Sequence, residues 1–326
     1  MTTPLRWGIL GTGGIAHKFA TGLSVLDDAQ AVAVGSRTQA AADAFADEFN
    51  IPNRHDSYEA LANDPEVEAI YIATPHPYHK DNTLLCLNAG KAVLVEKPFA
   101  INVAEAQTMI DLARSKKVFL MEAMWSRFLP TIVRARELIA SGAIGEVRML
   151  NADFGFRTNV NPKGRLFDLS LGGGALLDVG IYPLSLASML FGAPKTIAST
   201  ASIGETGADE QSAYLLGYDK GQIALLSSAS RTNTAHEALI YGTDGSIRIP
   251  DWWHAQKLIV NVNGKPSETL DIPHLGKGYA HEAIEVAECL RAGKLESATM
   301  SLDESLSITR TMDTIRAQWG LKYPSE

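Results

Sequence analysis

The sequence predicts an α/β fold: an N-terminal Rossmann-type, doubly wound parallel sheet, then a C-terminal α+β domain with a large, mostly antiparallel open sheet. Three observations predict it. A Gly-x-Gly-x-x-Ala loop at residues 11–16 follows an apolar run and opens a helix. Six strand-like runs alternate with helices as far as Met121. Farther along, strand-like runs follow one another with hairpin signals between them. We place the domain boundary after residue 123, so that the two domains are residues 1–123 and 124–326.

Composition and charge set the class of protein. Of the 326 residues, 46% are hydrophobic and 20% are charged, an ordinary balance for a globular protein. The net charge of −8 comes with no basic block, so we expect no nucleic-acid partner. Cys86 and Cys289 are spaced neither as metal ligands nor as a disulfide framework, which fits a reducing cytosol. The N-terminus has no leader pattern and no run approaches 18 apolar residues, so we expect a cytoplasmic protein with no membrane partner.

The glycine-rich loop indicates a dinucleotide site within residues 1–123. Gly11 permits a tight turn, and Gly13 lets backbone N–H groups approach a pyrophosphate at the helix N-terminus. The small Ala16 allows the helix to pack closely on the strand. We therefore expect four residues of this loop to bind the cofactor, namely Gly11, Gly13, Gly14 and Ile15.

The end of the second strand, residues 31–36, selects between the two nicotinamide cofactors. An NAD enzyme is expected to offer Asp or Glu there to the ribose 2′-hydroxyl. This chain offers Ser36, Arg37 and Thr38 instead. A guanidinium matches a 2′-phosphate in charge and geometry, and a hydroxyl adds a donor. We predict NADP as cofactor, with Ser36 and Arg37 as ligands. The alternative is that Arg37 is a solvated helix-start residue and that the enzyme also takes NAD.

A loop with two histidines follows the strand-like run 68–73. His76 and His79 raise the question of a metal site, but no third ligand with suitable spacing follows them. The His281-Glu282 pair likewise lacks the second histidine of a zincin motif. We expect no metal. Because the loop lies at the carboxyl end of a parallel strand, we expect it to line the cofactor cleft through Thr74, His76 and His79.

The tripeptide Glu96-Lys97-Pro98 ends the next buried strand-like run, 91–95. Ligands in open α/β sheets bind outside the carboxyl ends of strands, which makes this a candidate site. Pro98 disfavours a helical conformation at Lys97 and can make a cis bond, and either effect fixes the direction of the lysine. The competing interpretation is a surface Glu-Lys pair that closes a strand.

A segment that is apolar on every side, 175–184, follows three glycines at 172–174 and predicts a buried helix. Its ionisable residues are Asp178 and Tyr182, which stand at i and i+4 on one face. A buried carboxylate without a partner is costly, so we expect Asp178 to have one. A Tyr–Asp hydrogen bond inside the core is the alternative to a site. The glycines favour a site because they let a ligand or another backbone approach.

Seven strand-like runs in the second half predict a largely antiparallel sheet that is open on at least one face. An open face needs cover from a ligand, a helix or a second subunit, so we predict an oligomer. Helices are expected at 129–140, 279–292 and 302–319. The expected strands are 145–156, 196–203, 212–218, 222–230, 236–241, 246–249 and 257–261.

Taken together, these features resemble the Gfo/Idh/MocA family of oxidoreductases, over essentially the whole chain. Within that family the chain is most similar to the branch of dimeric trans-dihydrodiol dehydrogenases and NADP-dependent D-xylose dehydrogenases, on segments 121–128 and 180–182. The resemblance implies that residues 124–326 bind the substrate and form a homodimer through their sheet. Inositol-type members carry His where this chain has Tyr182, which argues against inositol. The resemblance rests on the glycine loop, Ala73-Thr74-Pro75 with His79, Glu96-Lys97-Pro98, and Gly172-Gly173-Gly174 with Asp178.

The resemblance implies that the chemistry belongs to Lys97, Tyr182 and Asp178. A secondary alcohol or hemiacetal carbon must give hydride to the nicotinamide while its hydroxyl loses a proton. A tyrosine with an ordinary pKa of about 10 is a poor base, and a nearby ammonium lowers that pKa. We therefore expect Tyr182 to exchange the proton, Lys97 to stabilise the alkoxide, and Asp178 to orient Lys97 or to bind a substrate hydroxyl. The alternative makes Lys97 the base, with Tyr182 only positioning the substrate.

The remaining site residues are also assigned through the resemblance. Glu96 is expected to support the cofactor pocket, and Arg127 to contact the cofactor. Aromatic walls suit the apolar faces of sugars or of a cyclic diol, and plain packing is the alternative for each of them. The expected cofactor ligands thus include Glu96, Lys97, Trp125 and Arg127, and the expected substrate contacts are Lys97, Trp125, Phe154, Phe156, Asp178 and Tyr182.

We predict an NADP-dependent oxidoreductase that acts on the CH–OH group of an aldose, such as xylose or glucose, or of a cyclic diol. One rival keeps the fold and changes the substrate to a keto-sugar or to an amino or phosphorylated sugar. The sequence after residue 150 contains no cluster of Arg and Lys that would indicate a phosphorylated substrate. The other rival is a catalytically silent NADP-binding regulator. The presence of both Lys97 and Tyr182 argues against this rival.

Overall fold

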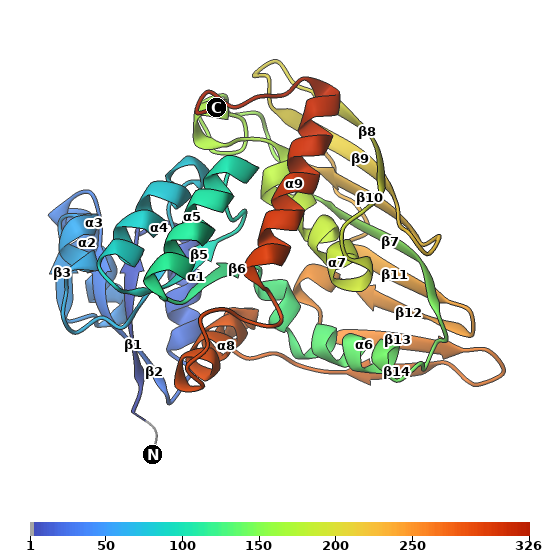
Figure 1. The fold of residues 1–326 in the computed structure, drawn as a ribbon, viewed down its shortest axis with the longest axis horizontal. Helices are drawn as coiled ribbons and strands as arrows, with labels where there is room; N and C mark the ends of the chain where they lie inside the picture. Colours follow the sequence, from blue (N-terminus) through green and yellow to red (C-terminus); the bar gives the residue numbers. More distant parts are fainter. Residues whose placement is uncertain (1–2) are drawn as a thin grey trace. The chain divides into compact units, whose positions relative to one another are not determined.

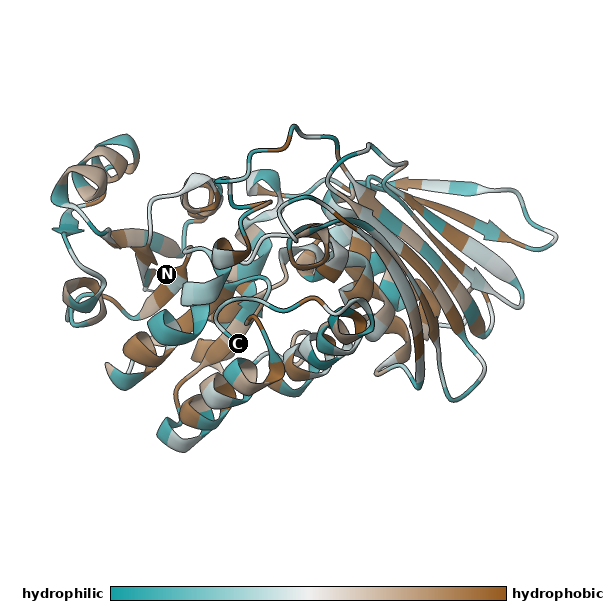
Figure 2. Cartoon of the chain, turned by 90° about the horizontal axis from the view of Figure 1, so that it is seen from above, coloured by the Kyte–Doolittle hydropathy of each residue, from teal (hydrophilic) through white to brown (hydrophobic). Residues whose placement is uncertain are grey.

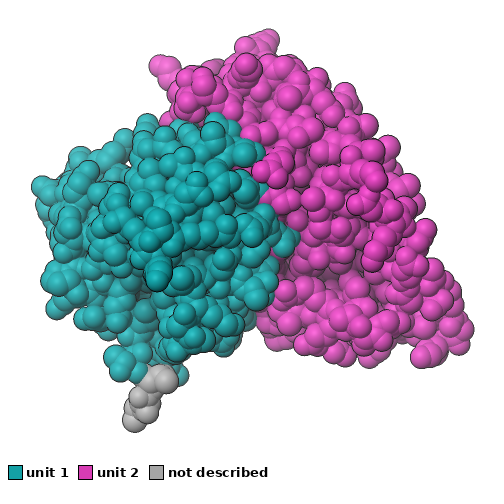
Figure 3. Space-filling view, in the orientation of Figure 1, with its two compact units in different colours: residues 1–125, 275–306 teal, residues 126–274, 307–326 magenta. Residues whose placement is uncertain are grey.

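A computed structural model describes residues 3–326 of the chain (Figure 1). The chain forms two compact units, residues 1–125 with 275–306 and residues 126–274 with 307–326 (Figure 3). Each unit therefore contains two separate stretches of sequence, whereas we predicted one continuous stretch per domain. The predicted domains, 1–123 and 124–326, stay a prediction.

The first unit contains a six-stranded sheet in the order β3-β2-β1-β4-β5-β6, with every pair parallel. Its central strands are continuously buried, as strands covered on both faces are. The strand order reverses between β1 and β4, which is where ligands bind in such sheets. The predicted doubly wound sheet is confirmed. Its strands are β1 Leu5–Leu10, β2 Ala29–Gly35, β3 Asn53–His55, β4 Ala69–Ile72, β5 Ala92–Glu96 and β6 Leu120–Ala123.

Helices cover both faces of this sheet because its side chains alternate between two apolar layers. On one face, Ile70 and Val93 belong to a buried cluster that includes Leu87 and Met109 from two helices. On the other face, Tyr71 stacks on Phe19 with ring centroids 3.8 Å apart. The helices of this unit are α1 Gly14–Leu23, α2 Gln39–Phe49, α3 Tyr58–Ala62, α4 His79–Asn88, α5 Val103–Lys116 and α8 Ala280–Arg291.

The second unit contains an eight-stranded sheet in the order β14-β13-β12-β11-β7-β10-β9-β8. All of its pairs are antiparallel except β7 with β10, which is parallel. The predicted large, mostly antiparallel sheet is confirmed, and its last strand was not predicted. The strands are β7 Val147–Gly155, β8 Thr196–Ile203, β9 Asp209–Gly217, β10 Ile223–Ala229, β11 Glu237–Gly242, β12 Gly245–Pro250, β13 Lys257–Val262 and β14 Glu268–Asp271.

One face of the large sheet is covered by α6 (Pro130–Ala140), α7 (Ile181–Phe191) and the second half of α9 (Leu302–Trp319) (Figures 1 and 2). Within residues 3–326, no helix lies over the opposite face. Burial alternates along β9, whose Tyr214 is buried while the neighbouring Leu215 is 50% exposed. The predicted open face is therefore present, and it carries large apolar side chains.

The segment after the triple glycine is buried, as predicted, but it is not one regular helix. Leu176–Gly180 form a π-helical turn, and α7 continues from it. Such turns widen the helix locally and recur at functional sites. The helical stretch Leu169–Phe191 is long and apolar enough to cross a membrane by composition alone, but 78% of its most apolar window is buried inside the protein, as in a core helix.

Candidate active site

The glycine loop joins β1 to α1 and leaves room for a phosphate. Gly11 has a φ of +100°, and a Cβ there would lie 3.1 Å from the Ala73 carbonyl oxygen, so the turn requires glycine. A Cβ built at Gly13 or Gly14 meets no other described atom within 4 Å. Gly13 stands at the N-cap of α1 and brings no capping side chain, so the first N–H groups of the helix remain available to a pyrophosphate.

The end of β2 carries hydroxyls and a guanidinium. Ser36 is buried, and its Oγ lies 3.5 Å from Thr12 Oγ1 on the glycine loop. Arg37 is exposed and lies close enough to Tyr58 to lower the pKa of that phenol, which burial raises more strongly. Thr38 has a local structural role, since its hydroxyl accepts the Ala41 N–H as the N-cap of α2. Contact of Ser36 and Arg37 with the ribose stays a prediction.

His79 ties two loops at the carboxyl end of the sheet together. Its ring is fully buried, with Nδ1 2.8 Å from the Pro98 carbonyl oxygen and Nε2 2.9 Å from the Thr74 carbonyl oxygen. Burial lowers the pKa of His79 to about 4, so the ring is neutral at physiological pH and donates to one of these carbonyls. The ring of His76 lies 5.8 Å from that of His79. Contact of Thr74, His76 and His79 with the cofactor stays a prediction.

Glu96 and Lys97 lie at the end of β5, and their neighbours hold them in place. The Glu96 carboxylate is buried, accepts a hydrogen bond from Tyr71 Oη, and receives the Lys97 N–H at 3.2 Å. The Lys97–Pro98 peptide bond is cis, as the sequence allowed. Lys97 is only half-buried among fully buried neighbours, so its side chain reaches the surface of this unit. The arrangement fits the predicted supporting role of Glu96.

A second buried acid, Glu282 on α8, lies near Glu96. Glu282 is fully buried, and neither of its carboxylate oxygens has a hydrogen-bond partner among residues 3–326. Burial, and then the negative charge of Glu96, raises its pKa well above the usual range. Burial raises the pKa of Glu96 as well, although the Lys97 charge and the Tyr71 hydroxyl oppose the shift. The two carboxyls therefore disfavour each other's charged form, and each holds its proton to a higher pH than an ordinary glutamate does.

The π-helical turn that carries Asp178, and the first residues of α7 with Tyr182, lie in the second unit. Both residues are 5% exposed. Asp178 Oδ1 forms an ion pair at 2.6 Å with Nη1 of Arg165, whose side chain is 58% exposed. The partner that we required for this buried carboxylate is thus an arginine from the preceding loop. Solvent screens this ion pair on the side of the exposed Arg165, so the pair contributes little to stability by itself.

Aromatic side chains surround Tyr182 in the same unit. Phe154 packs edge-on against Tyr182, with ring centroids 5.3 Å apart, and stacks on Trp253 at 4.7 Å. Phe154 is buried, whereas Phe156 is partly exposed and its N–H bonds the Ala229 carbonyl of β10. Phe154 thus packs between Tyr182 and Trp253, which the sequence did not single out. Contact of Phe154 and Phe156 with a substrate stays a prediction.

Trp125 and Arg127 are both buried in their own units. Trp125 stacks on Tyr279, with ring centroids 4.4 Å apart. Arg127 donates from Nε to Ser185 Oγ at 2.8 Å and from Nη2 to the Ser185 carbonyl at 2.6 Å. These contacts anchor Arg127 to α7. Binding of cofactor or substrate by either residue stays a prediction.

Sequence reasoning gave no role at these sites to Arg165, Tyr279 and Trp253, and it considered Glu282 only as part of a metal motif. A signal existed for Glu282, because it shares the apolar stripe of α8 with Ala283 and Val286 and should have been recognised as buried. Arg165 lies in an irregular loop and had no such signal. Among residues 3–326, no three His, Cys, Asp or Glu side chains are grouped to hold a metal ion. The expectation of no metal stays a prediction.

Two family models match the chain. The oxidoreductase family with an NAD-binding Rossmann fold matches residues 5–124, and the GFO/IDH/MocA C-terminal domain matches residues 132–248. Among curated proteins, the chain is similar to trans-1,2-dihydrobenzene-1,2-diol dehydrogenases along its whole length. It is 42% identical to the mouse protein, covering 99% of both chains. It is 37% identical to the human protein, again covering 99% of both.

Solved structures of the same fold include two oxidoreductases. An aldose-aldose oxidoreductase from Caulobacter crescentus, complexed with glycerol, superposes with a TM-score of 0.88 at 25% identity, over 97% of this chain and 98% of that one. A 3-ketoreductase from Actinomadura kijaniata, in complex with NADP and TDP-benzene, superposes with a TM-score of 0.86 at 23% identity over the same shares. At that identity the second likeness establishes the fold alone.

These matches identify an NAD(P)-binding dehydrogenase or reductase that acts on CH–OH groups. The fold agrees with them, since the first unit provides the nucleotide-binding sheet and the second the large mixed sheet. The chain therefore belongs to the Gfo/Idh/MocA oxidoreductase family, and its full-length curated relatives are named trans-1,2-dihydrobenzene-1,2-diol dehydrogenases.

Proposed function

We propose that this enzyme is an NADP-dependent dehydrogenase that oxidises a CH–OH group of a sugar or of a cyclic diol, or reduces the corresponding carbonyl. NADP, when bound, supplies the nicotinamide that accepts or returns the hydride. The observation that carries the proposal is the 42% identity to the mouse trans-1,2-dihydrobenzene-1,2-diol dehydrogenase over 99% of both chains. Lys97 and Tyr182, the two groups that would manage the proton and the negative charge, are both present.

Tyr182 is proposed to exchange the proton with the substrate oxygen. Its ring is held by Phe154 at 5.3 Å, so the hydroxyl has a restricted position. Lys97, half-buried at the end of β5, would stabilise the alkoxide by its charge. Asp178, now paired with Arg165, would accept a bond from a neighbouring substrate hydroxyl or orient Lys97. Lys97 as the base, with Tyr182 positioning the substrate, is the variant of this mechanism that mutants would separate.

NADP is the preferred cofactor in this proposal because β2 ends without a carboxylate. Residues 36–38 are Ser-Arg-Thr. Arg37 is exposed, and the adjacent Ser36 contacts Thr12 of the glycine loop. A guanidinium binds a 2′-phosphate in a bidentate, charge-assisted manner, whereas it offers no acceptor to a ribose 2′-hydroxyl. Gly11, Gly13, Gly14 and Ile15 would hold the pyrophosphate at the start of α1.

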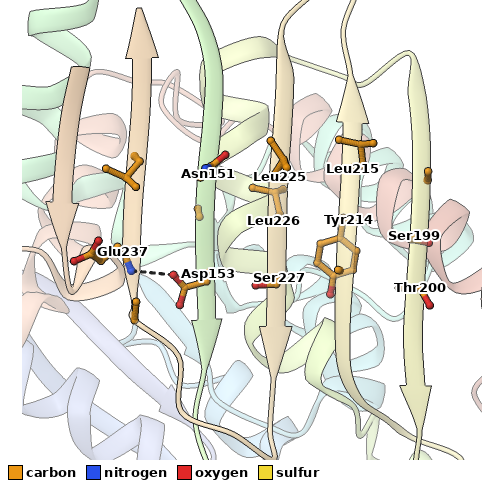
Figure 4. Close-up of a pocket in the computed structure, with 15 residues that line it drawn as sticks. Asn151, Asp153, Ser199, Thr200, Tyr214, Leu215, Leu225, Leu226, Ser227 and Glu237 are labelled. Atoms are coloured by element: carbon orange, nitrogen blue, oxygen red, sulfur yellow. Dashed lines mark hydrogen bonds between the residues drawn. The ribbon is translucent and has the colours of Figure 1, made fainter. Parts of the chain in front are cut away.

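The open face of the large sheet is proposed to bind a second copy of the chain. Leu215 of β9 and Leu225 of β10 are cross-strand partners on this face, 50% and 44% exposed (Figure 4). A contiguous apolar patch of this kind marks an interface more often than free surface. Changing Leu225 to Glu should convert a dimer to a monomer in light scattering, while Leu275→Glu, at a 53% exposed site in the other unit, should not. A wild-type monomer at micromolar concentration would remove the proposal.

We also propose a cytoplasmic location. Cys86 and Cys289 are buried, unpaired thiols, which suits a reducing compartment. Fractionation of the native host's cells, with the chain detected by antibody, would place it in a soluble, reducing fraction if the proposal holds.

The function is tested by NADPH fluorescence titration and by a substrate panel. The panel contains trans-1,2-dihydrobenzene-1,2-diol, xylose, glucose and a keto-sugar, each assayed with NADP and NAD. Turnover of the diol or an aldose with NADP supports the proposal. Turnover of the keto-sugar alone favours the reductase. Tight NADPH binding without turnover of any member indicates the silent regulator.

A further inference from the structure

The π-helical turn that carries Asp178 and leads into α7 with Tyr182 is bound at its start by a carboxylate from another part of the chain. Asp209, the first residue of β9, is 1% exposed, and its Oδ2 accepts the Leu176 N–H at 2.7 Å. Its Oδ1 lies 2.2 Å from where a Cβ of Gly174 would be. Because Gly174 also has a φ of +131°, only glycine permits this approach. A carboxylate thus meets the first N–H groups of the π-helical turn, as an N-cap does.

Hydroxyl groups from the same sheet support the other end of the turn. A Cβ at Gly180 would lie 2.6 Å from Tyr214 Oη and 2.9 Å from Ser228 Oγ. These two hydroxyls are hydrogen-bonded to each other at 2.7 Å and lie fully inside the unit. The turn between Gly174 and Gly180 therefore touches polar groups of β9 and β10 at both of its ends, within the second unit.

The ionisation of Asp209 depends on this contact. Burial raises its pKa to about 7, while the backbone N–H groups of the turn and the positive charge of Arg316 oppose the rise. The other ionisable groups that face it are Tyr214 and Tyr323, and burial raises the pKa of both phenols, so they remain neutral. Asp209 consequently becomes charged within the neutral range, and its charged form is the better acceptor for the Leu176 N–H.

We propose that Asp209 is a positioning residue for the reaction: its carboxylate fixes the start of the turn at Leu176 and thereby aims Asp178 and Tyr182. This rests on the proposed function, because it takes Tyr182 as the proton-exchanging group. Asp209 is assigned a positioning role because both of its carboxylate oxygens face the turn: Oδ2 accepts the Leu176 N–H, and Oδ1 lies 2.2 Å from where a Cβ of Gly174 would be. An exact orientation matters because displacement of a reacting group by about 1 Å can cost two orders of magnitude in rate.

The first test measures the turn directly and needs no substrate. Asp209→Asn keeps the shape and one acceptor oxygen but removes the charge, so the chain should fold. Hydrogen–deuterium exchange of peptides covering 174–182 should be faster in this variant at pH 8.5. In the wild type, protection of the same peptides, corrected for intrinsic exchange, should rise between pH 6 and pH 8.5, a measurement that requires no variant. Unchanged protection in both experiments would overturn the proposal.

The second test separates positioning from stability through the pH profile. At pH 8.5, Asp209→Asn should reduce kcat about tenfold, because a neutral acceptor holds the N–H less strongly than a carboxylate. At pH 5.5, where wild-type Asp209 is protonated, the ratio of the two kcat values should approach one. The Kd for NADPH should agree within twofold, because the nucleotide loop lies in the first unit. A ratio of one at pH 8.5, or a constant ratio at all pH values, would contradict positioning.

Asp64→Asn provides the matched control. Asp64 is also a buried carboxylate, 6% exposed, that accepts a backbone N–H, from Glu66 at 2.8 Å, but it lies in the first unit away from Lys97. Its variant should be destabilised without any change in the kcat profile or in exchange at 174–182. If the wild type turns over no panel substrate, the proposed function fails while the exchange experiment still decides the role of Asp209. If the wild type is active and Asp209→Asn behaves like Asp64→Asn, only this inference fails.

Discussion

Each unit buries an acid close to a segment that carries a residue proposed for catalysis, and the surroundings of the two acids differ. Glu282, in the first unit, interacts with the charge of Glu96, the neighbour of Lys97, and neither of its oxygens has a hydrogen-bond partner among residues 3–326. Asp209, in the second unit, receives a backbone N–H at 2.7 Å. Burial raises the pKa of both, well above the usual range for Glu282 but to about 7 for Asp209.

The difference shows that burial alone does not decide whether an acid is charged. Burial raises the pKa of any carboxyl group, and N–H donors or positive charges lower it again. Glu282 has only a negative neighbour and is expected to be neutral at pH 7. Asp209 has N–H groups and Arg316, so it is expected to gain its charge near pH 7. The first unit thus holds an acid near Glu96 whose pKa is raised well above the usual range, and the second holds one at the start of the π-helical turn whose pKa is raised to about 7.

The largest expected effect comes from the side chains that these two regions support. Tyr182→Phe and Lys97→Met should each reduce kcat by about two orders of magnitude or more, because each removes a proton-transfer or charge-stabilising group. NADPH fluorescence titration should give a Kd close to wild type for Tyr182→Phe. Tyr218→Phe is the control, since the buried Tyr218 hydroxyl has no hydrogen-bond partner among residues 3–326 and its loss should not change kcat. Near-normal turnover in both site variants would remove the catalytic assignment.

Arg37→Ala tests whether the first unit alone selects the cofactor. The variant should weaken NADPH binding about tenfold to a hundredfold and leave NADH binding unchanged, since the lost guanidinium would contact only the 2′-phosphate. Arg54→Ala, a solvent-facing arginine that pairs with Asp47, serves as the control and should bind both cofactors as the wild type does. Equal loss of affinity for NADPH and NADH would show that Arg37 does not read the phosphate.

Two glycine-to-alanine variants compare the glycine loop of the first unit, where a methyl group meets free space, with the π-helical turn of the second, where it meets a carboxylate. Gly13→Ala meets free space, so its stability should be near wild type, but the new methyl should weaken NADPH binding about tenfold. Gly174→Ala meets the Asp209 carboxylate at a φ of +131°, so it should lower the free energy of unfolding by about 2–3 kcal/mol. Urea denaturation and NADPH titration of both variants check this. A Gly13→Ala variant that loses stability, together with a Gly174→Ala variant that loses only NADPH affinity, would be inconsistent with the structure.

Glu282→Gln should give the smallest effect. The sign of the change in the free energy of unfolding is nevertheless the most informative result. The folded-state pKa of Glu282 is raised, so the folded protein binds more protons than the unfolded chain, and stability falls as the pH rises above the unfolded value of about 4.3. Because glutamine does not ionise, the variant does not lose stability in this way as the pH rises. Urea denaturation should therefore show the variant about 1–2 kcal/mol more stable than the wild type at pH 8, with little difference at pH 4.5. A variant less stable at pH 8 would mean that Glu282 is charged in the folded protein.

Much of the first unit could be predicted because its signals are local. Each signal lies within a few residues: the glycine loop, the apolar runs of the strands and the tripeptide 96–98. In a parallel sheet covered by helices, such loops lie at the carboxyl ends of the strands. In the second unit, Asp178 and Tyr182 could be singled out because they interrupt an apolar segment. The number of strands was predicted closely, but the parallel pairing of β7 with β10 was not.

The sequence by itself determined the nucleotide-binding sheet, the absence of a carboxylate after β2, and the two polar residues in a buried segment. Only the tertiary structure decided what touches them. Residues 275–306 return to the first unit and bring Glu282, and β9 places Asp209 against an N–H group 33 residues earlier in the chain. Such contacts leave no periodic pattern, because hydrophobic periodicity reports only whether a side chain is buried. The partner inside the core, and with it the charge of a buried acid, is set by the packing of distant segments.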